Sequence, residues 1–161
     1  NRDTRCASVD ALLASTRVST EQAALVSRLT GELISVLEPD ISEENKKRLL
    51  WAAKLHEVGT MISTSKYHRH SEYIVRHADL PGFSTEEQLL LSAYVLGHRG
   101  GLGKLEGRLN DTRFLTRLLA LRLAVIFAHA RADVKLPAIS AKGTLPGLTL
   151  RVDKHWLEDH P

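Results

Sequence analysis

Six histidines and one acidic neighbour are the residues of this sequence that could carry chemistry. His56 is followed directly by Glu57 in the segment LLWAAKLHEVG. Imidazole nitrogens and carboxylate oxygens bind a divalent ion when several of them converge on one point. The set therefore raises a metal site as a hypothesis, although each helical histidine taken alone favours a packed or surface role. Its members lie within or at the ends of segments with helical periodicity and are His56, His68, His70, His77, His98 and His129.

A glycine-rich segment, GHRGGLGKLEG, resembles a phosphate-binding loop but does not match the motif of one. The Walker pattern needs glycine where His98 stands and Ser or Thr where Leu105 stands. That pattern also follows a strand, whereas this segment follows an expected helix. We therefore predict a plain loop, in which Arg99 and Lys104 are available to meet an anion.

Five segments show the apolar spacing of helices, and most of them carry end signals. Ser19 with Gln22 forms a capping-box pattern, and Ser84 stands three residues before a glutamate. Ser42 and Asp111 are N-cap residues of the second and fifth segments. The segments span residues 19–37, 42–59, 65–80, 84–99 and 111–133, with Gly59 expected as the C-terminal cap of the second and Pro81-Gly82 closing the third.

These helices are expected to pack around an aliphatic core, because Leu and Ala abound and aromatic residues make up only 5% of the chain. The fifth segment is rich in leucine and predicts a central, buried helix. Trp51 is expected in the core. The other predicted core residues are Val26, Leu29, Leu50, Ala53, Ile74, Leu90, Val95, Leu119 and Ile126.

The composition changes after Pro137, where turn residues and one short alternating run replace the helical pattern. Residues 148–152 predict a strand. Because a single strand is not stable alone, we expect it to begin a small β-containing unit or to pair with strands outside this sequence. The expected organisation is a helical domain over 1–136 and the truncated start of that unit over 137–161, with Trp156 anchoring the tail.

Length and composition are those of a single globular domain. The chain has 161 residues, of which 43% are hydrophobic and 25% charged. Its formal charge of +3 is compatible with an anionic partner and equally with a mixed solvated surface. Cys6 is the only cysteine, which excludes an internal disulfide and thiolate zinc sites. The sequence has no apolar run long enough to span a bilayer and no signal-peptide pattern, and we expect a cytoplasmic piece of a longer protein.

Four segments in order resemble the C-terminal helical domain of the exopolyphosphatase / guanosine pentaphosphate phosphohydrolase family. They are LLWAAKLHEVG, SKYHRHSEYIVRHADLPGFSTEEQ, GHR and LLALRLAVIFAHAR, and the similarity covers roughly residues 8–131. The resemblance implies an all-α domain related to the His-Asp (HD) phosphohydrolases. In that family two actin-like ATPase-fold domains precede it and carry out hydrolysis, and a small C-terminal unit follows.

The resemblance also implies that an ancestral metal site has been lost. Metal-dependent His-Asp domains take one His from an early helix, the His-Asp pair, and one Asp from a late helix. In this sequence the early position falls on Gln22, the pair reads His56-Glu57, and the late position falls on Val125. An amide is a poor ligand and valine has no donor atom. We therefore expect a remnant that binds no metal, in which His56 and Glu57 form hydrogen bonds that tie helices together.

A basic group is the expected anion-binding surface of the domain, with simple solvation as the open alternative. In the resembling family the helical domain borders a basic channel through which an anionic chain reaches the hydrolytic site. The family often carries a further basic residue directly after the His-Arg pair, where this sequence has Gly100, so Lys104 is expected to compensate. The expected substrate-binding residues are His68, Arg69, His98, Arg99 and Lys104.

The resemblance implies a parent enzyme that releases terminal orthophosphate from polyphosphate or guanosine pentaphosphate, with magnesium in that parent and no cofactor in this domain. This piece is expected to be inactive alone, without catalytic residues, and to serve as a polyphosphate-channel and assembly module. Its expected partners are polyphosphate or another polyanion, the upstream domains, and a second copy in a homodimer. Two alternatives stay open: a metal-dependent HD phosphohydrolase in its own right, and a non-catalytic dimerisation or regulatory domain.

Overall fold

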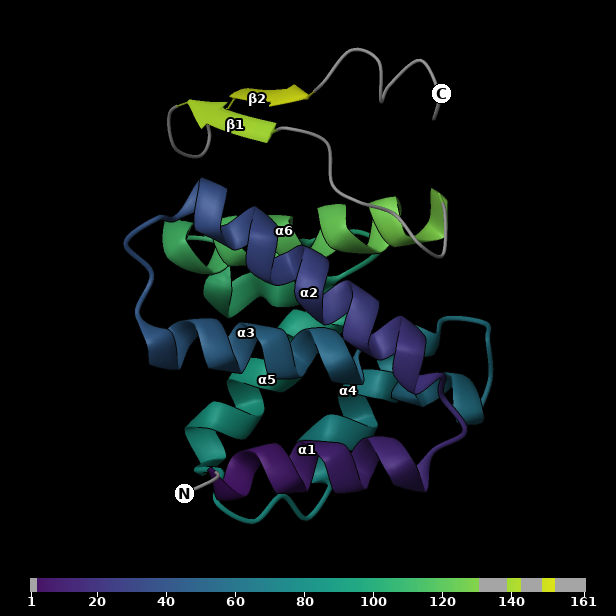
Figure 1. The fold of residues 1–161 in the computed structure, drawn as a ribbon. Helices are drawn as coiled ribbons and strands as arrows, with labels where there is room; N and C mark the ends of the chain where they lie inside the picture. The colour runs from purple at the N-terminus through teal and green to yellow at the C-terminus, as the bar shows by residue number, and fades with distance from the viewer. Residues whose placement is uncertain (1–2, 131–138, 143–148, 153–161) are drawn as a thin grey trace.

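The computed structural model describes residues 3–130, 139–142 and 149–152, and the first of these ranges is entirely helical apart from its connections (Figure 1). Two short 3₁₀ helices, η1 and η2, interrupt the connections that follow α3 and α5. The helices are α1 (Thr4–Ser15), α2 (Thr20–Leu37), α3 (Glu43–Leu55), η1 (Val58–Met61), α4 (Tyr67–His77), α5 (Thr85–Gly97), η2 (Gly103–Arg108) and α6 (Thr112–Ala130), and the strands are β1 (Ile139–Lys142) and β2 (Thr149–Val152).

The helices pack in a chain of neighbours around one core. α2 packs against α6 and against α3, and α3 in turn packs against α5, which pairs with α4. α1 lies beside α3 at the opposite end of the molecule from the strands (Figure 1). The core is aliphatic, with one stacked aromatic pair of Tyr94 and Phe114 at 4.9 Å between ring centroids. The all-α prediction is confirmed, and residues 20–130 contain no strand.

The helix starts predicted from capping residues are confirmed by the capping hydrogen bonds. The Ser19 hydroxyl accepts from the backbone N–H of Gln22, and the Asp111 carboxylate caps α6 in the same way. Ser84 and Glu87 form a complete capping box at α5. Four N–H groups are left without a partner at every helix start, and these side chains satisfy some of them.

α1 is a helix that the sequence pattern did not predict. Asp3 caps it by accepting from the N–H of Arg5. Only Ser8, Val9 and Leu13 are buried along its length. Its apolar stripe is therefore too narrow to predict a helix from the sequence. Packing against the rest of the domain determines the position of the helix.

The predicted C-terminal cap at Gly59 is wrong. α3 ends at Leu55 with His56 as its cap, and Gly59 lies inside η1. A Cβ atom at position 59 would lie 2.2 Å from the backbone nitrogen of Ser71 and 2.4 Å from the carbonyl oxygen of Tyr67. Glycine is needed here because two backbones touch, and the Gly59 N–H donates to the Ser71 hydroxyl at 2.7 Å.

The predicted core is confirmed at four of nine positions, confirmed in part at four more, and wrong at Ile126. Four of the nine residues are buried, and Leu50, Ile74, Leu90 and Leu119 are partly buried. Ile126 is 62% exposed, because α6 turns its neighbours Val125 and Phe127 toward the core instead. The fully buried four are Val26, Leu29, Ala53 and Val95.

Two predictions about irregular segments need amendment. The glycine-rich segment expected as a plain loop contains η2 over Gly103–Arg108. The predicted strand coincides with β2, and its partner lies within this chain: β1 pairs antiparallel with it, Ile139 opposite Val152, and β1 lies beside α2. The domain boundary at 136/137 stays a prediction, and Trp156 lies outside the described residues. No helix in the described ranges is long and apolar enough to cross a membrane.

Candidate anion-binding site

Two buried histidines join the ends of α3 and α5. His56 and His98 are the C-cap residues of these helices, and each ring places Nδ1 against the carbonyl oxygen three residues earlier, Ala53 and Val95 respectively. Because a carbonyl only accepts, Nδ1 carries the hydrogen in both rings. The two rings meet edge to face at 5.0 Å between centroids. Their contact fixes the relative position of the two helix ends.

Both rings of this pair are neutral near pH 7. Burial lowers the pKa of His56, while the neighbouring Glu57 carboxylate acts in the opposite direction. Burial also lowers the pKa of His98 to about 2, and protonation of the adjacent His56 ring would lower it further. His98 Nε2 accepts from the Tyr67 hydroxyl at 3.0 Å, and His56 Nε2 has no hydrogen-bond partner among the described residues.

The residues that the resemblance places at former metal positions do not form a ligand set that fits an ion. Gln22 lies in the first turn of α2, and Val125 is buried in α6. His56 Nε2 stands 3.4 Å from a Glu57 oxygen. Valine offers no donor atom, and His56 uses Nδ1 within its own helix. In residues 3–130 no three His, Cys, Asp or Glu side chains are grouped to hold a metal. The failure to bind metal stays a prediction.

The structure brings four of the five predicted anion-binding residues together. His68 and Arg69 lie in the first turn of α4, Arg99 follows the cap of α5, and Lys104 lies in η2. Burial lowers the pKa of the Lys104 ammonium, and the positive charges of Arg122, Arg69 and Arg99 lower it further. A Cβ atom at Gly100 would lie 2.9 Å from Lys104 Nζ and 3.8 Å from His68 Nε2, so these two side chains lie close together. Three separate elements therefore supply one cluster of positive charge.

His98, the fifth predicted residue, lies apart from this surface. Its side chain is only 3% exposed, and its two ring nitrogens are occupied by Val95 and Tyr67. It orients the Tyr67 ring instead, over whose face the Arg99 guanidinium lies at 5.0 Å. His98 is thus placed to support the cluster from beneath rather than to contact an anion.

Arg122 completes the cluster and was missed by the sequence prediction. It lies on α6 and donates from Nε to the carbonyl of Gly97 at 2.8 Å and from Nη2 to that of Gly100 at 2.6 Å. The signal was a single basic residue inside the leucine-rich segment LLALRLAVIF. We define the cation cluster as His68, Arg69, Arg99, Lys104 and Arg122.

Among the described residues, the four charged members of the cation cluster lie together without an acidic partner, unlike Arg5 and Arg117. Within residues 3–130, no carboxylate lies in ion-pair distance of any of them. Arg5 and Arg117, by contrast, hold carboxylates at short range: Arg117 binds Glu38 at 2.8 Å in the interior. Unneutralised cations held close together are the usual electrostatic footprint of an anion site.

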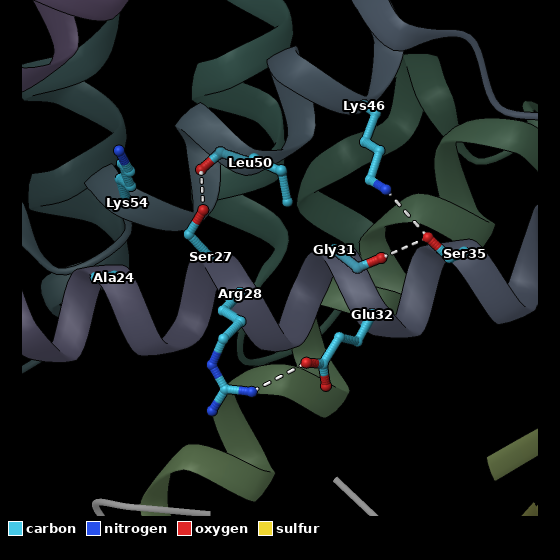
Figure 2. Close-up of a pocket in the computed structure, with 9 residues that line it drawn as sticks. All are labelled: Ala24, Ser27, Arg28, Gly31, Glu32, Ser35, Lys46, Leu50 and Lys54. Carbon is cyan, nitrogen blue, oxygen red and sulfur yellow. Dashed lines mark hydrogen bonds and ion pairs between the residues drawn. The ribbon is translucent and has the colours of Figure 1, made fainter. Parts of the chain in front are cut away.

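A surface hollow of about 660 Å³ lies elsewhere, between α2 and α3 (Figure 2). Most of its polar groups are already engaged with one another. Arg28 pairs with Glu32 at 3.0 Å, and the Lys46 ammonium donates to the Ser35 hydroxyl at 3.1 Å (Figure 2). The Ser27 hydroxyl reaches the Leu50 carbonyl. Because these polar groups are engaged with one another, the cation cluster is the better candidate.

One family model matches almost the whole chain. Residues 4–161 match the family model described as Ppx/GppA phosphatase, domain III. The chain belongs to this family. Two curated relatives bear the name guanosine-5'-triphosphate,3'-diphosphate pyrophosphatase. The protein of Pseudoalteromonas translucida (strain TAC 125) is 35% identical over 171 residues, covering 100% of this chain and 34% of its own length.

The second relative matches a shorter part of this chain. The protein of Vibrio vulnificus (strain YJ016) is 35% identical over 135 residues, which is 81% of this chain and 26% of that protein. The chain thus spans about a third or less of the length of the curated relatives it matches. The family predicted from the sequence is confirmed, and the activity of a longer protein is a separate question.

Proposed function

We propose that this domain is the polyanion-channel and assembly module of a phosphatase that cleaves phosphoanhydride bonds, and that it does not hydrolyse them itself. The observation that carries the proposal is the cation cluster, in which Arg69, Arg99, Lys104 and Arg122 converge from three helical elements and a loop without an acidic partner in residues 3–130. A polyphosphate chain carries about one charge per phosphate, so a row of such cations is its matching surface. The degenerate HD ancestry, the homodimer and the cytoplasmic location belong to the same proposal.

The parent substrate is proposed to be guanosine pentaphosphate or polyphosphate. Both present phosphoanhydride bonds and a run of negative charges to the cation cluster. The names of the two relatives support the guanosine compound. The groups that select between the two substrates are expected in the upstream domains, together with the magnesium that neutralises the reacting phosphates.

Binding of a short polyphosphate chain to the 161-residue protein tests the channel role. We expect measurable affinity in low salt that falls steeply as salt rises. Replacing Arg69 and Arg99 together by Ala should flatten the dependence of log affinity on log salt by about 1.5–2, since each phosphate contact contributes a little under one unit. Arg113→Ala is the matched control, because this exposed arginine is already paired with Glu38. An unchanged slope in the double variant would remove the support for the channel.

Absence of hydrolysis by the 161-residue chain tests the second half of the proposal. Phosphoryl transfer depends on positioning and charge neutralisation around the transferred group, normally by metal ions and backbone amides. The residues at the former metal positions do not supply such a set, so no phosphate should be released from polyphosphate or guanosine pentaphosphate, with or without magnesium. Turnover that follows purity and disappears in His56→Ala would instead favour an HD phosphohydrolase in its own right.

A further inference from the structure

Lys104 is the one primary amine of the cation cluster, and it lies among three arginines. Its Nζ atom donates to the carbonyl oxygen of Arg99 at 2.6 Å. A Cβ atom at Gly100 would lie 2.9 Å from the same nitrogen, and the Gly100 carbonyl accepts from Arg122 Nη2 at 2.6 Å. Lys104 and Arg122 therefore reach the same residue, one from η2 and the other from α6. Arg69 and Arg99 are the other two arginines whose charge acts on this amine.

The surroundings of Lys104 differ from those of two other lysines, Lys47 and Lys54. The Lys47 ammonium lies 3.8 Å from a carboxylate oxygen of Glu44, and that of Lys54 lies 3.9 Å from one of Asp10. No carboxylate in residues 3–130 lies at such a distance from Lys104. A negative charge added to the Lys104 nitrogen would thus be attracted by its neighbours, whereas one added at Lys47 or Lys54 would be repelled by the nearby carboxylate.

The cations around Lys104 also favour its uncharged form. Burial lowers the pKa of the Lys104 ammonium, and the charges of Arg122, Arg69 and Arg99 lower it further. Only the uncharged amine has a lone pair, so only this form is a nucleophile. The uncharged amine has two N–H donors, and one is enough for the bond to the Arg99 carbonyl. Its lone pair is then free to react.

An uncharged lysine amine reacts with carbon dioxide without an oxidant or a reductant. The Nζ lone pair attacks the carbon atom and forms a C–N bond, while one C=O electron pair moves to oxygen. Nζ then loses one proton to water. The product is a carbamate, in which the side chain ends in an N–H and a carboxylate instead of an ammonium. The remaining N–H can still donate to the Arg99 carbonyl, so Lys104 can keep its position.

We propose that Lys104 is a site of reversible carbamylation by carbon dioxide, and that Arg69, Arg99 and Arg122 stabilise the carbamate. Guanidinium groups suit a carboxylate because their planar N–H donors match its two oxygens. The carbamate supplies the cation cluster with the acidic partner that residues 3–130 do not provide. The modification itself does not depend on the proposed function.

Carbamylation turns the positive charge of Lys104 into a negative one and engages arginines that would otherwise meet a polyanion. Bicarbonate is in equilibrium with carbon dioxide, so it should weaken polyphosphate binding by modifying this residue. This consequence rests on the proposed function, whereas the modification does not.

Chemical trapping on the 161-residue protein tests the modification. The protein is equilibrated with bicarbonate at one fixed pH, carbamates are converted to stable ethyl esters with triethyloxonium ion, and the modified residues are identified by peptide mass spectrometry. We expect about tenfold higher occupancy at Lys104 than at Lys47 or Lys54, because charge-assisted hydrogen bonds stabilise the carbamate only at Lys104. Equal occupancy at the three lysines would overturn the assignment.

Nuclear magnetic resonance with ¹³C-labelled carbon dioxide gives a second readout that needs no trapping. Lys104→Arg keeps the positive charge but has no nucleophilic amine, so it should remove one carbamate resonance of the wild-type protein. Lys47→Arg is the matched control and should leave that resonance in place. A carbamate spectrum that is the same in Lys104→Arg and wild type would contradict the site.

Removal of one stabilising cation tests the role of the arginines. Arg69 is exposed at the start of α4, so Arg69→Ala is expected to fold. It should lower the carbamate occupancy of Lys104 about twofold to fivefold, the size of one partly exposed charge pair. Arg113→Ala is the control, because this arginine is paired with Glu38 at 3.5 Å, and it should change nothing. Occupancy that does not respond to Arg69→Ala would contradict stabilisation by the cation cluster.

Polyphosphate binding in bicarbonate and in chloride, at the same pH and ionic strength, tests the consequence. We expect bicarbonate to lower the affinity of the wild-type protein about threefold to tenfold and to leave that of Lys104→Arg unchanged. An equal fall in both proteins would mean competition by the anion and would contradict this consequence. If polyphosphate binds in neither buffer, the proposed function fails, and the trapping at Lys104 still decides the modification.

Discussion

The basic side chains at the two ends of α5 differ in whether they are paired with carboxylates. At its N-terminal end, Glu87 closes the capping box and also holds Arg5 at 2.5 Å and Arg48 at 2.9 Å. Arg5 in turn binds Asp3 and Glu44 and lies over the Trp51 ring at 4.9 Å. At the C-terminal end, the cation cluster has no carboxylate at ion-pair distance within residues 3–130.

The difference separates charge that holds the fold from charge that is available to a ligand. At the N-terminal end each cation is neutralised by side chains from α1, α3 and α5, so the network fastens three helices together. At the C-terminal end Arg122 and Lys104 bind only carbonyls, and their positive charges repel one another. Such repulsion lowers stability unless an anion relieves it. We infer that the first end is structural and the second is functional.

Removal of Glu87 should give the largest loss of stability. Glu87→Ala breaks the capping box and leaves Arg5 and Arg48 without their shared partner. We expect the free energy of unfolding to fall by about 2–3 kcal/mol, measured by urea titration. Glu86→Ala, at an exposed position in the same turn, is the control and should change it far less. A loss of polyphosphate affinity in folded Glu87→Ala would contradict the inference that the N-terminal end of α5 has only a structural role.

Acid should remove the stabilisation given by the groups at the N-terminal and C-terminal ends of α5 in different pH ranges. The pKa of Asp3 is lowered to about 2, first by its hydrogen bond with the Arg5 side chain, and Arg48 and Arg5 keep that of Glu87 below its usual value despite burial. Carboxylates with lowered pKa values stabilise the fold above about pH 4.5, and this contribution disappears as the pH falls through the folded-state values.

The histidines near the C-terminal end of α5 should lower the stability of the fold at a higher pH than the carboxylates do. Burial lowers the pKa of His68 and His98 to about 4 and about 2, so the unfolded chain takes up protons first, from about pH 6.5 downward. Urea midpoints should therefore begin to fall below about pH 6.5. Glu87→Gln should reduce the further fall below about pH 4.5, and His68→Gln should reduce the fall above it. The same change in both variants would contradict the assignment.

Single changes in the cation cluster should have the smallest effect on stability. Arg69 is exposed at the start of α4, and Arg69→Ala removes one repelling charge. We expect its free energy of unfolding to stay within about 0.5 kcal/mol of wild type. Affinity for polyphosphate should fall by about threefold to tenfold in the same protein. A large loss of stability in Arg69→Ala would place this residue with the structural end instead.

The helix starts were predictable because a cap is a local signal. Ser19, Ser84 and Asp111 each act on an N–H within three residues, so the sequence alone contains the whole interaction. α1 has no strong apolar stripe and is placed by contacts with α3, which no local pattern reveals. Gly59 was misread for the same reason, since its glycine is required by the backbone of α4 twelve residues away.

The site was predictable in its basic residues but not in their orientation. The resemblance identified His68, Arg69, Arg99 and Lys104, which the structure brings together. It could not show that His98 turns inward to Tyr67, because this depends on how α4 and α5 cross. Ile126 was misassigned because one apolar residue in a leucine-rich helix carries no information on which face is buried.

Mapping the position of bound polyphosphate on the ¹⁵N-labelled 161-residue protein tests the central claim most directly. We predict that amide shifts change around Gly100, at Lys104 and in the first turn of α4, and that the amides of Glu87, Arg5 and Arg48 stay unchanged. These shifts should shrink with added salt. Changes concentrated at the Glu87 network or in the hollow between α2 and α3, with the Gly100 region silent, would contradict it.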